Sequence, residues 1–307
     1  MNTKKENISN LAHKFGFDLI GFASAKPLIS QAQNLNLWLT MGYNANMKFF
    51  LNTIEKRQNI KNILPDAKTV IMLAVNYYNQ HNHSEINPRT QGKIARFAWG
   101  KDYHLVISNM LEKLTNNIKV LYPEAQTIYY VDTGPIMEKP WAQTSGIGWQ
   151  GKNSLIITKE YGSWVFLATI VTNLEIEPDL PAKNLCGSCN ICIKNCPTNA
   201  IAEHGILNAN KCIAYWTIED KTGLIPNEII QNLNGWLFGC DICQQVCPYN
   251  LKPKPTQIPE FKTFYHTSIN FSDILDSSNR QFKLSFKDTP LERRKLELIK
   301  NIIKKIM

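Results

Sequence analysis

Eight cysteines are the most concentrated group of reactive side chains in this chain of 307 residues. The first run has the spacing C-x2-C-x2-C-x3-C-P and consists of Cys186, Cys189, Cys192 and Cys196. The second run consists of Cys240, Cys243 and Cys247 and also ends before a proline. A single cysteine, Cys212, stands between the two runs. The first spacing is that of bacterial ferredoxins, whose thiolates bind iron–sulfur clusters. Because eight thiolates are the number that two cubanes need, the chain is predicted to hold two [4Fe–4S] clusters.

The ferredoxin spacing also predicts how the ligands are divided. In two-cluster ferredoxins, the fourth cysteine of a run binds the other cluster. One cluster would therefore take the first three thiols of the first run and the last of the second: Cys186, Cys189, Cys192 and Cys247. The other cluster would take Cys196, Cys240 and Cys243, and Cys212 completes its set as the only thiol left.

Two other interpretations of the cysteines are disfavoured. Zinc ribbons usually use paired C-x2-C knuckles separated by a longer spacer, and the first run is too dense for that pattern. A disulfide framework suits small secreted chains, whereas this chain is long and begins without an apolar leader segment. We therefore expect a cytoplasmic protein, in which reduced thiols can accept iron.

The rest of the chain mixes helical and strand patterns, so the fold class is expected to be α+β. Residues 69–77 form a β-branched apolar run typical of a buried strand, and 103–121 carry apolar residues at helical spacing. We also expect a helix over 29–51 and a hairpin of strands 154–157 and 163–172. The last helix is predicted to begin at a capping box with proline in its first turn, Thr289-Pro290-Leu291-Glu292.

Prolines suggest the domain boundaries. Pro178 and Pro181 precede the cysteines, and Pro253 and Pro255 follow them. We expect an α+β domain over residues 1–175, a ferredoxin-like domain over 176–250 and a basic C-terminal helical segment over 251–307. No apolar run is long enough to span a bilayer.

Charge is unevenly distributed along the chain. The net charge is +9, and residues 251–307 supply +6 of it, from 12 Lys and Arg against 6 Asp and Glu. A basic segment beside a redox site suggests a polyanionic partner such as a nucleic acid. A solvated charged helix face is the simpler interpretation of the same residues.

Two motifs before the cysteines could contribute to a site. Asp132 follows a predicted strand and precedes a Gly-Pro turn, where a carboxylate in an apolar pocket could have a raised pKa and donate a proton. From the residues alone, a turn-capping aspartate is the favoured interpretation. Gly146, Gly148 and Gly151 fit G-x-G-x-x-G, but the expected order is helix before and strand after, the reverse of a dinucleotide-binding loop. A tight loop that admits a large flat cofactor explains these glycines at least as well.

Taken together, the chain resembles the epoxyqueuosine reductases, which depend on cobalamin and iron–sulfur clusters and act in tRNA queuosine synthesis. The resemblance covers residues from about 5 to 300 and rests on the cysteine pattern and on the stretches Arg96 to His104, Val131 to Pro135, Ala142 to Asn153 and Phe238 to Cys243. The ferredoxin motif occurs in many proteins, whereas its combination with the Asp132 and Gly146–Asn153 segments is more specific.

The resemblance implies a nitroreductase-like cobalamin-binding domain followed by a bacterial-type two-cluster ferredoxin domain. It implies reduction of epoxyqueuosine to queuosine at the wobble position of tRNA, with electrons passed through the clusters to cobalamin. Asp132 then corresponds to the proton donor beside the cofactor, and other positions corresponding to cobalamin contacts are Arg57, Asn153, Ile156 and Leu167. The implied partners are a tRNA anticodon loop and an external low-potential electron donor, with a monomeric chain and no membrane. Many members carry C-terminal helical repeats, for which this chain has little room.

Two alternatives remain open at this point. A related cobalamin-dependent, dehalogenase-like reductase of small molecules would not need the basic surface. A non-enzymatic ferredoxin-type electron-transfer protein would leave the first 175 residues without a purpose.

Overall fold

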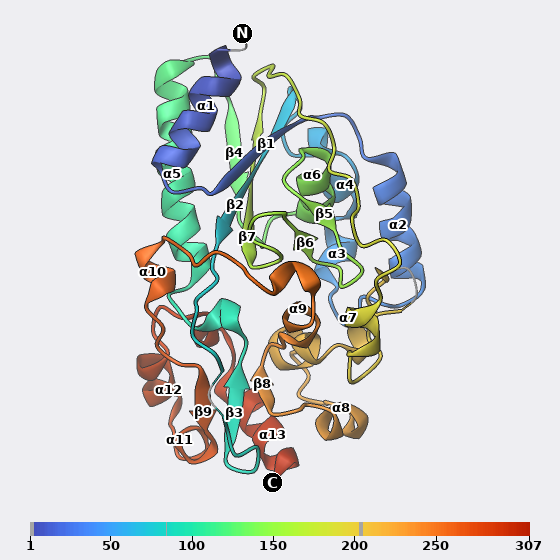
Figure 1. Cartoon of the computed structure of the whole chain (residues 1–307), viewed down its shortest axis with the longest axis vertical. Helices are drawn as coiled ribbons and strands as arrows, with labels where there is room; N and C mark the ends of the chain where they lie inside the picture. Colours follow the sequence, from blue (N-terminus) through green and yellow to red (C-terminus); the bar gives the residue numbers. More distant parts are fainter. Residues whose placement is uncertain (1–2, 84, 203–204) are drawn as a thin grey trace.

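The computed structural model describes residues 3–83, 85–202 and 205–307. The chain forms two halves stacked along the long axis, with the N-terminal helix at one end and the C-terminal helix at the other (Figure 1). The upper half is built on an antiparallel sheet of order β1-β2-β7-β4, whose strands are β1 (Leu19–Ser24), β2 (Thr69–Asn76), β4 (Thr127–Tyr130) and β7 (Val165–Thr172).

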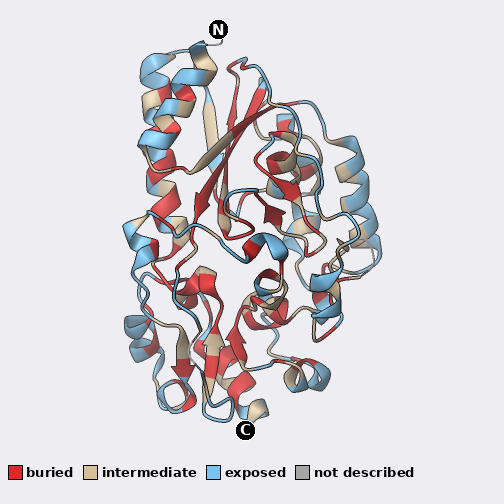
Figure 2. Cartoon of the chain, viewed as in Figure 1, coloured by how far each residue is buried: buried red, intermediate tan, exposed pale blue. Residues whose placement is uncertain are grey.

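The central strand β2 shows why the sheet forms where it does. All eight of its residues are buried, as the β-branched apolar run predicted. Because side chains alternate along a strand, its residues divide between two cores: Ile71 and Leu73 pack on one face, and Val70 and Met72 pack on the other. Figure 2 shows this strand and its neighbour β7 as the buried centre of the upper half.

Helices cover both faces of the upper sheet. On one face lie α1 (Thr3–Lys14) and α5 (Tyr103–Leu121), which bury Ile8, Ile107 and Leu111 against it. The other face is covered by α6 (Glu138–Thr144), whose Trp141 is buried beside β2. The bounds of α5 coincide with the predicted helix, and the combination of helices with an antiparallel sheet confirms the α+β class.

The lower half is assembled from segments far apart in the sequence. Its sheet has the order β8-β3-β9, from β3 (Gln91–Ile94), β8 (Trp236–Phe238) and β9 (Ser268–Asn270). The β3–β8 pair is parallel and the β3–β9 pair is antiparallel. The helices of this half are α8 (Asn227–Gln231), α11 (Phe271–Leu275), α12 (Asn279–Ser285) and α13 (Leu296–Ile306). The predicted division at residues 175 and 250 stays a prediction, and in space β3 joins the C-terminal strands.

Short elements surround the junction of the halves. They are α3 (Phe49–Asn52), α4 (Ile54–Gln58), α7 (Ile191–Lys194), α9 (Ile242–Gln245), α10 (Pro259–Lys262), β5 (Trp149–Gln150) and β6 (Ile156–Ile157). The single helix predicted over 29–51 is wrong in extent: α2 (Ile29–Thr40) ends early, and the chain turns at Gly42, whose φ of +66° ends a helix readily. No residue of α2 is buried, so packing does not prolong it.

Two further predictions need correction. The strands over 154–157 and 163–172 do not pair as a hairpin, because β6 pairs with β5 while β7 pairs with β2 and β4, and only Thr158 and Gly162 bridge the turn. The last helix begins at Leu296, since the predicted start forms only a separate 3-10 turn, Pro290–Arg293. The Thr289 hydroxyl donates to the Phe286 carbonyl instead of accepting from the first turn. In the part of the chain described, no helix is long and apolar enough to cross a membrane.

Candidate active site

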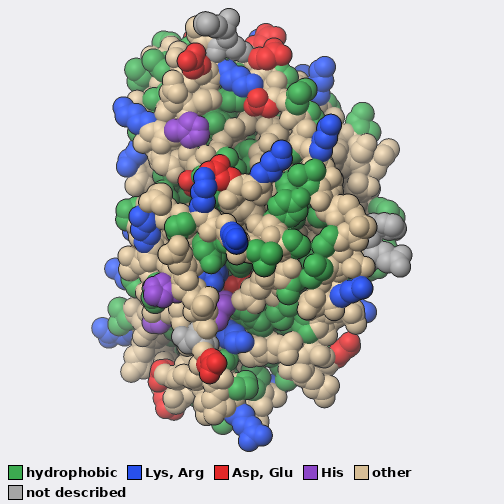
Figure 3. Space-filling view, in the orientation of Figure 1, with side chains coloured by type: hydrophobic (Ala, Val, Ile, Leu, Met, Phe, Trp, Pro, Cys, Tyr) green, Lys and Arg blue, Asp and Glu red, His purple; other side chains and the backbone are tan. Residues whose placement is uncertain are grey.

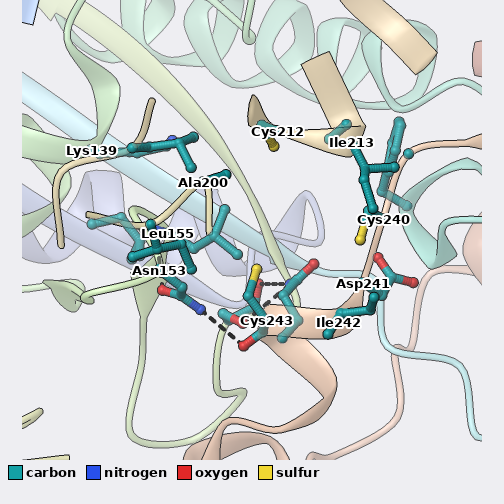
Figure 4. A pocket seen from close by; sticks show the side chains of 18 of the residues that line it. Lys139, Asn153, Leu155, Ala200, Cys212, Ile213, Cys240, Asp241, Ile242 and Cys243 are labelled. Carbon is teal, nitrogen blue, oxygen red and sulfur yellow. Dashed lines mark hydrogen bonds between the residues drawn. The ribbon is translucent and has the colours of Figure 1, made fainter. Parts of the chain in front are cut away.

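A cavity of about 340 Å³ lies between the two halves. Its upper wall comes from β6, β7, the loop before α6 and the first turn of α6, and it includes Ile156, Leu167, Asp132 and Lys139. Its lower wall includes four cysteines, Cys196, Cys212, Cys240 and Cys243. Figure 4 shows the last three of these on the side of the cavity opposite Lys139. A single space therefore adjoins both a carboxylate and one complete predicted set of cluster ligands.

Asp132 is held in an unusual backbone conformation at the end of β4. Its φ is +56°, a region that residues other than glycine rarely adopt. Arg57 stabilises the loop, since its guanidinium donates to the Ile136 carbonyl at 2.9 Å and to the Gly134 carbonyl at 3.2 Å. The Asp132 side chain is 58% exposed, which leaves its carboxylate accessible to a substrate in the cavity.

A hydrogen-bonded chain of side chains leads to this carboxylate. The Tyr103 hydroxyl donates to Asp132 Oδ2 at 2.8 Å, and His104 Nε2 lies 3.3 Å from the same oxygen. On its other side, His104 Nδ1 lies 2.8 Å from Asp102 Oδ1. Asp102 is the N-cap of α5, accepting from the His104 backbone N–H at 3.0 Å, so the helix start fixes the imidazole between two carboxylates.

The surroundings move the pKa values of these groups in different directions. Burial raises the pKa of Asp132, but hydrogen bonds from His104 and Tyr103 outweigh it and hold the pKa below its usual range. Burial lowers the pKa of His104, but the bonds to Asp102 and Asp132 outweigh it and raise the pKa. The pKa of Asp132 thus moves opposite to the direction suggested by the sequence, because the apolar surroundings include two donors. The network favours an imidazolium beside two carboxylates.

Glu138 and Lys139 add a second pair of ionisable groups to the cavity. Burial and the charge of Asp132 raise the pKa of Glu138 to about 8, so its carboxyl holds a proton at neutral pH. Glu138 Oε1 accepts from the Asp132 backbone N–H at 3.2 Å. Burial also lowers the pKa of Lys139, although the charge of Asp132 opposes that shift. Perturbed titrating groups in a cleft are typical of a catalytic site.

The sequence did not identify Tyr103, His104, Glu138 or Lys139 as site residues. An aspartate at the start of a long predicted helix is a recognisable N-cap, and it was the available signal for His104. The other predicted cofactor contacts divide into two groups. Asn153, Ile156 and Leu167 line the cavity, whereas Arg57 lies outside its described lining and supports the Asp132 loop.

The glycine motif has a packing explanation. Gly146, with φ +81°, follows α6, and β5 comes next, so the order is the reverse of a dinucleotide-binding loop, as expected. A Cβ on Gly148 would lie 2.4 Å from the Ile157 carbonyl oxygen. These glycines let β5 approach β6, whose Ile156 lines the cavity.

The larger electrostatic interactions among the cysteines fall into two sets. Burial raises the pKa of Cys192, and neighbouring thiolates raise it further: Cys247, Cys186 and Cys189. Burial likewise raises the pKa of Cys243, helped most among the cysteines by Cys212 and Cys196 and less by Cys192 of the other set. Cys212 and Cys243 raise the pKa of Cys240 in the same way. This grouping agrees with the predicted division of ligands, which itself stays a prediction. Among the described residues, no three His, Cys, Asp or Glu side chains lie close enough together to hold a single metal ion. A cubane does not need such a group, because each of its irons takes one thiolate.

Two family models match the chain. One, described as epoxyqueuosine reductase QueG, DUF1730, matches residues 57–133, and the other, a 4Fe-4S double cluster binding domain, matches residues 185–250. An epoxyqueuosine reductase of Synechocystis is 47% identical over 234 residues, which cover 76% of this chain and 80% of the relative. One from Atelocyanobacterium thalassa is 42% identical over 95% of both chains.

A solved structure agrees with these sequence relatives. A crystal structure of an epoxyqueuosine reductase with an epoxyqueuosine-modified tRNA stem loop superposes with a TM-score of 0.90 and 34% identity, covering 98% of this chain and 80% of that one. The fold and the double-cluster motif define an iron–sulfur oxidoreductase with its site between two halves. More specifically, the chain belongs to the epoxyqueuosine reductase family.

Proposed function

We propose that this chain reduces epoxyqueuosine to queuosine at the wobble position of tRNA. The single observation that carries the proposal is the cavity on which Asp132, with its Tyr103 and His104 partners, and one predicted set of cluster ligands converge. Deoxygenation of an epoxide consumes two electrons and two protons and yields an alkene and water. The cavity therefore brings an electron source and a proton source to the same substrate.

The clusters and the cobalamin would occupy separate parts of this region. The double-cluster domain supplies eight thiolates for two [4Fe–4S] clusters, and the set at the cavity wall would deliver electrons to it. The upper wall of the cavity includes the apolar Ile156, Phe166 and Leu167. This largely apolar lining suits a corrin, and we assign the upper half to the nitroreductase-like cobalamin-binding type. When bound, cobalamin would supply a low-potential cobalt centre that acts as reductant or nucleophile.

The residues of the chain would hold and deliver the proton. Asp132 lines the cavity, and a protonated Asp132 beside a bound epoxide would stabilise the developing alkoxide and then protonate it. The pKa of His104 is raised and its Nε2 lies 3.3 Å from the Asp132 carboxylate, so a protonated His104 would resupply the proton after each turnover. Tyr103 orients the same oxygen. Asn153, Ile156 and Leu167 line the cavity and would contact the cofactor, and Arg57 would act through the loop that positions Asp132.

The partners follow from the charge and the reaction. The net charge of +9 supports tRNA binding through phosphates, and a single-stranded anticodon loop can present an unstacked base to the cavity. An external low-potential donor must supply the electrons, and we place a monomeric enzyme in the cytoplasm.

Anaerobic reconstitution with iron and cobalamin tests the proposal. The loaded protein should convert epoxyqueuosine in a tRNA stem loop to queuosine when a chemical reductant is supplied, as measured by mass spectrometry of the nucleosides. Full loading of both cofactors without any queuosine product would contradict the proposal. An affinity for the stem loop that barely weakens with added salt would contradict the electrostatic part.

A further inference from the structure

The four cysteines predicted to hold the first cluster lie away from the cavity. All four cysteines of the second set line it, whereas its described lining includes none of the first set, Cys186, Cys189, Cys192 and Cys247. Thiols of both sets are partly exposed, apart from the buried Cys247, so the two sets differ in their position relative to the cavity and not in their exposure. Electrons that travel to the cavity through two clusters should therefore enter the protein at the first set. This inference rests on the proposed function.

Large apolar side chains are exposed around this entry point. They are Leu185, Ile191, Tyr249 and Leu251, here called the cysteine rim, and Leu251 is 74% exposed. The Tyr249 hydroxyl lies 3.5 Å from the Leu185 carbonyl, which brings the two cysteine runs together at the surface. Figure 3 shows hydrophobic side chains gathered right of centre on this face, near α7. A contiguous exposed apolar patch typically marks an interaction surface.

The two chain segments that carry the cysteine rim are basic. Segments 180–196 and 245–254 contain no Asp or Glu, and they contain the lysines Lys183, Lys194, Lys252 and Lys254. Lys254 is paired with Glu160, so the other three give the rim its positive charge. An apolar centre with lysines at its edge is complementary to an acidic protein surface, and such complementarity accelerates encounter.

We propose that the cysteine rim is the docking surface for a small acidic protein that carries one electron. Each docking oxidises the carrier by one electron and reduces the first cluster by one electron. Two dockings supply the two electrons that, with two protons, release the epoxide oxygen as water. An acidic carrier is favoured over RNA here because the substrate base must enter the cavity at Asp132, whereas the rim surrounds cysteines that do not line it.

A matched pair of double variants tests the docking surface. The rim variant combines Leu251→Ser with Lys252→Glu, and the control combines Val120→Ser with Lys119→Glu at the exposed end of α5, where Val120 is 78% exposed. Both are reconstituted with iron, checked for iron content and melting temperature, and mixed in a stopped-flow instrument with a reduced flavodoxin of net negative charge. Lys194→Glu provides an independent rim variant that changes one side chain.

At low salt, the rate constant for cluster reduction by flavodoxin should fall on the order of tenfold in both rim variants and stay at the wild-type value in the control. Added salt should narrow this difference. Reduction by methyl viologen, a small mediator that needs no docking surface, should be unchanged in every variant.

Three results would overturn the proposal. The first is an equal rate of reduction by flavodoxin in the rim and control variants. The second is a rim variant that loses affinity for the tRNA stem loop while its rate of reduction by flavodoxin is unchanged. The third is a wild-type protein that forms a dimer and a rim variant that is monomeric, with no difference between their rates. Cluster reduction is measured without tRNA, so it tests docking independently of the proposed function. If protein reduced by methyl viologen formed no queuosine, that result would count against the proposed function and would leave the docking test intact.

Discussion

Replacing Asp132 by Asn isolates proton delivery from the rest of the site. The amide oxygen can still accept from the Tyr103 hydroxyl, now 2.8 Å from Asp132 Oδ2, and asparagine tolerates the φ of +56°. The lost ion pair with His104 involves a side chain that is 58% exposed, so the free energy of unfolding should change by less than about 1 kcal/mol. Loss of a positioned general acid typically slows a reaction by about 10² to 10⁴-fold. A hundredfold loss corresponds to about 2.7 kcal/mol in the activation free energy.

The assay is a single turnover with pre-reduced, fully loaded protein and an epoxyqueuosine stem loop, followed by nucleoside mass spectrometry. Cofactor content by visible absorbance and the melting temperature should match the wild type. Asp288→Asn is the matched control, because Asp288 is exposed and has a similar φ of +58°. A D132N rate equal to that of the control would refute proton delivery by Asp132 and return it to the role of a turn residue.

Three further predictions follow from the structure. Because the pKa of Glu138 is raised to about 8, turnover should fall as the pH rises through 8, and Glu138→Gln should remove this loss of activity. In the folded chain Glu138 also keeps a proton that the unfolded chain releases above the ordinary glutamate pKa of 4.5. The free energy of unfolding should therefore fall as the pH rises from 4.5 to 8, and fall less in E138Q. Cys212→Ala should retain about four irons of eight after reconstitution, and unchanged iron content would show that Cys212 is no ligand. Gly21→Ala places a Cβ 2.1 Å from the Ser145 carbonyl oxygen and should destabilise by at least about 1–3 kcal/mol. Gly42→Ala meets no atom within 4 Å but has φ +66°, so only conformational strain of about 1 kcal/mol is expected; equal melting temperatures for these two alanine variants would argue against the clash.

Local patterns predicted the elements whose burial follows from their own residues. The run of β2 is apolar on both faces and is buried on both, and the apolar spacing of α5 gave its bounds. The helix over 29–51 failed because α2 buries none of its residues, so no packed face prolongs it past Gly42, and no local rule reveals that. The start of the last helix failed because the Thr289 hydroxyl has a nearby carbonyl acceptor at Phe286.

The site was predictable only where spacing alone carries the chemistry. The cysteine runs are local, so their motif was informative. His104 lies 28 residues before Asp132, and the two meet only because α5 and β4 pack in the upper half. Likewise, the depressed pKa of Asp132 depends on donors from another element, so the apolar-pocket argument gave the wrong direction.

The lower sheet has a consequence for the order of assembly during synthesis. Strand β3 ends at Ile94, but its parallel partner begins at Trp236 and its antiparallel partner at Ser268. At ribosomal speeds of about 5–20 residues per second, the chain needs roughly 7–28 s to extend from the first of these strands to the second. The upper sheet needs nothing beyond Thr172, so it can close earlier. The nascent chain can therefore pair the strands of its upper sheet while β3 is still unpaired, although Phe261 of the upper core is made only later. The cysteines of the second run follow directly after the parallel partner of β3.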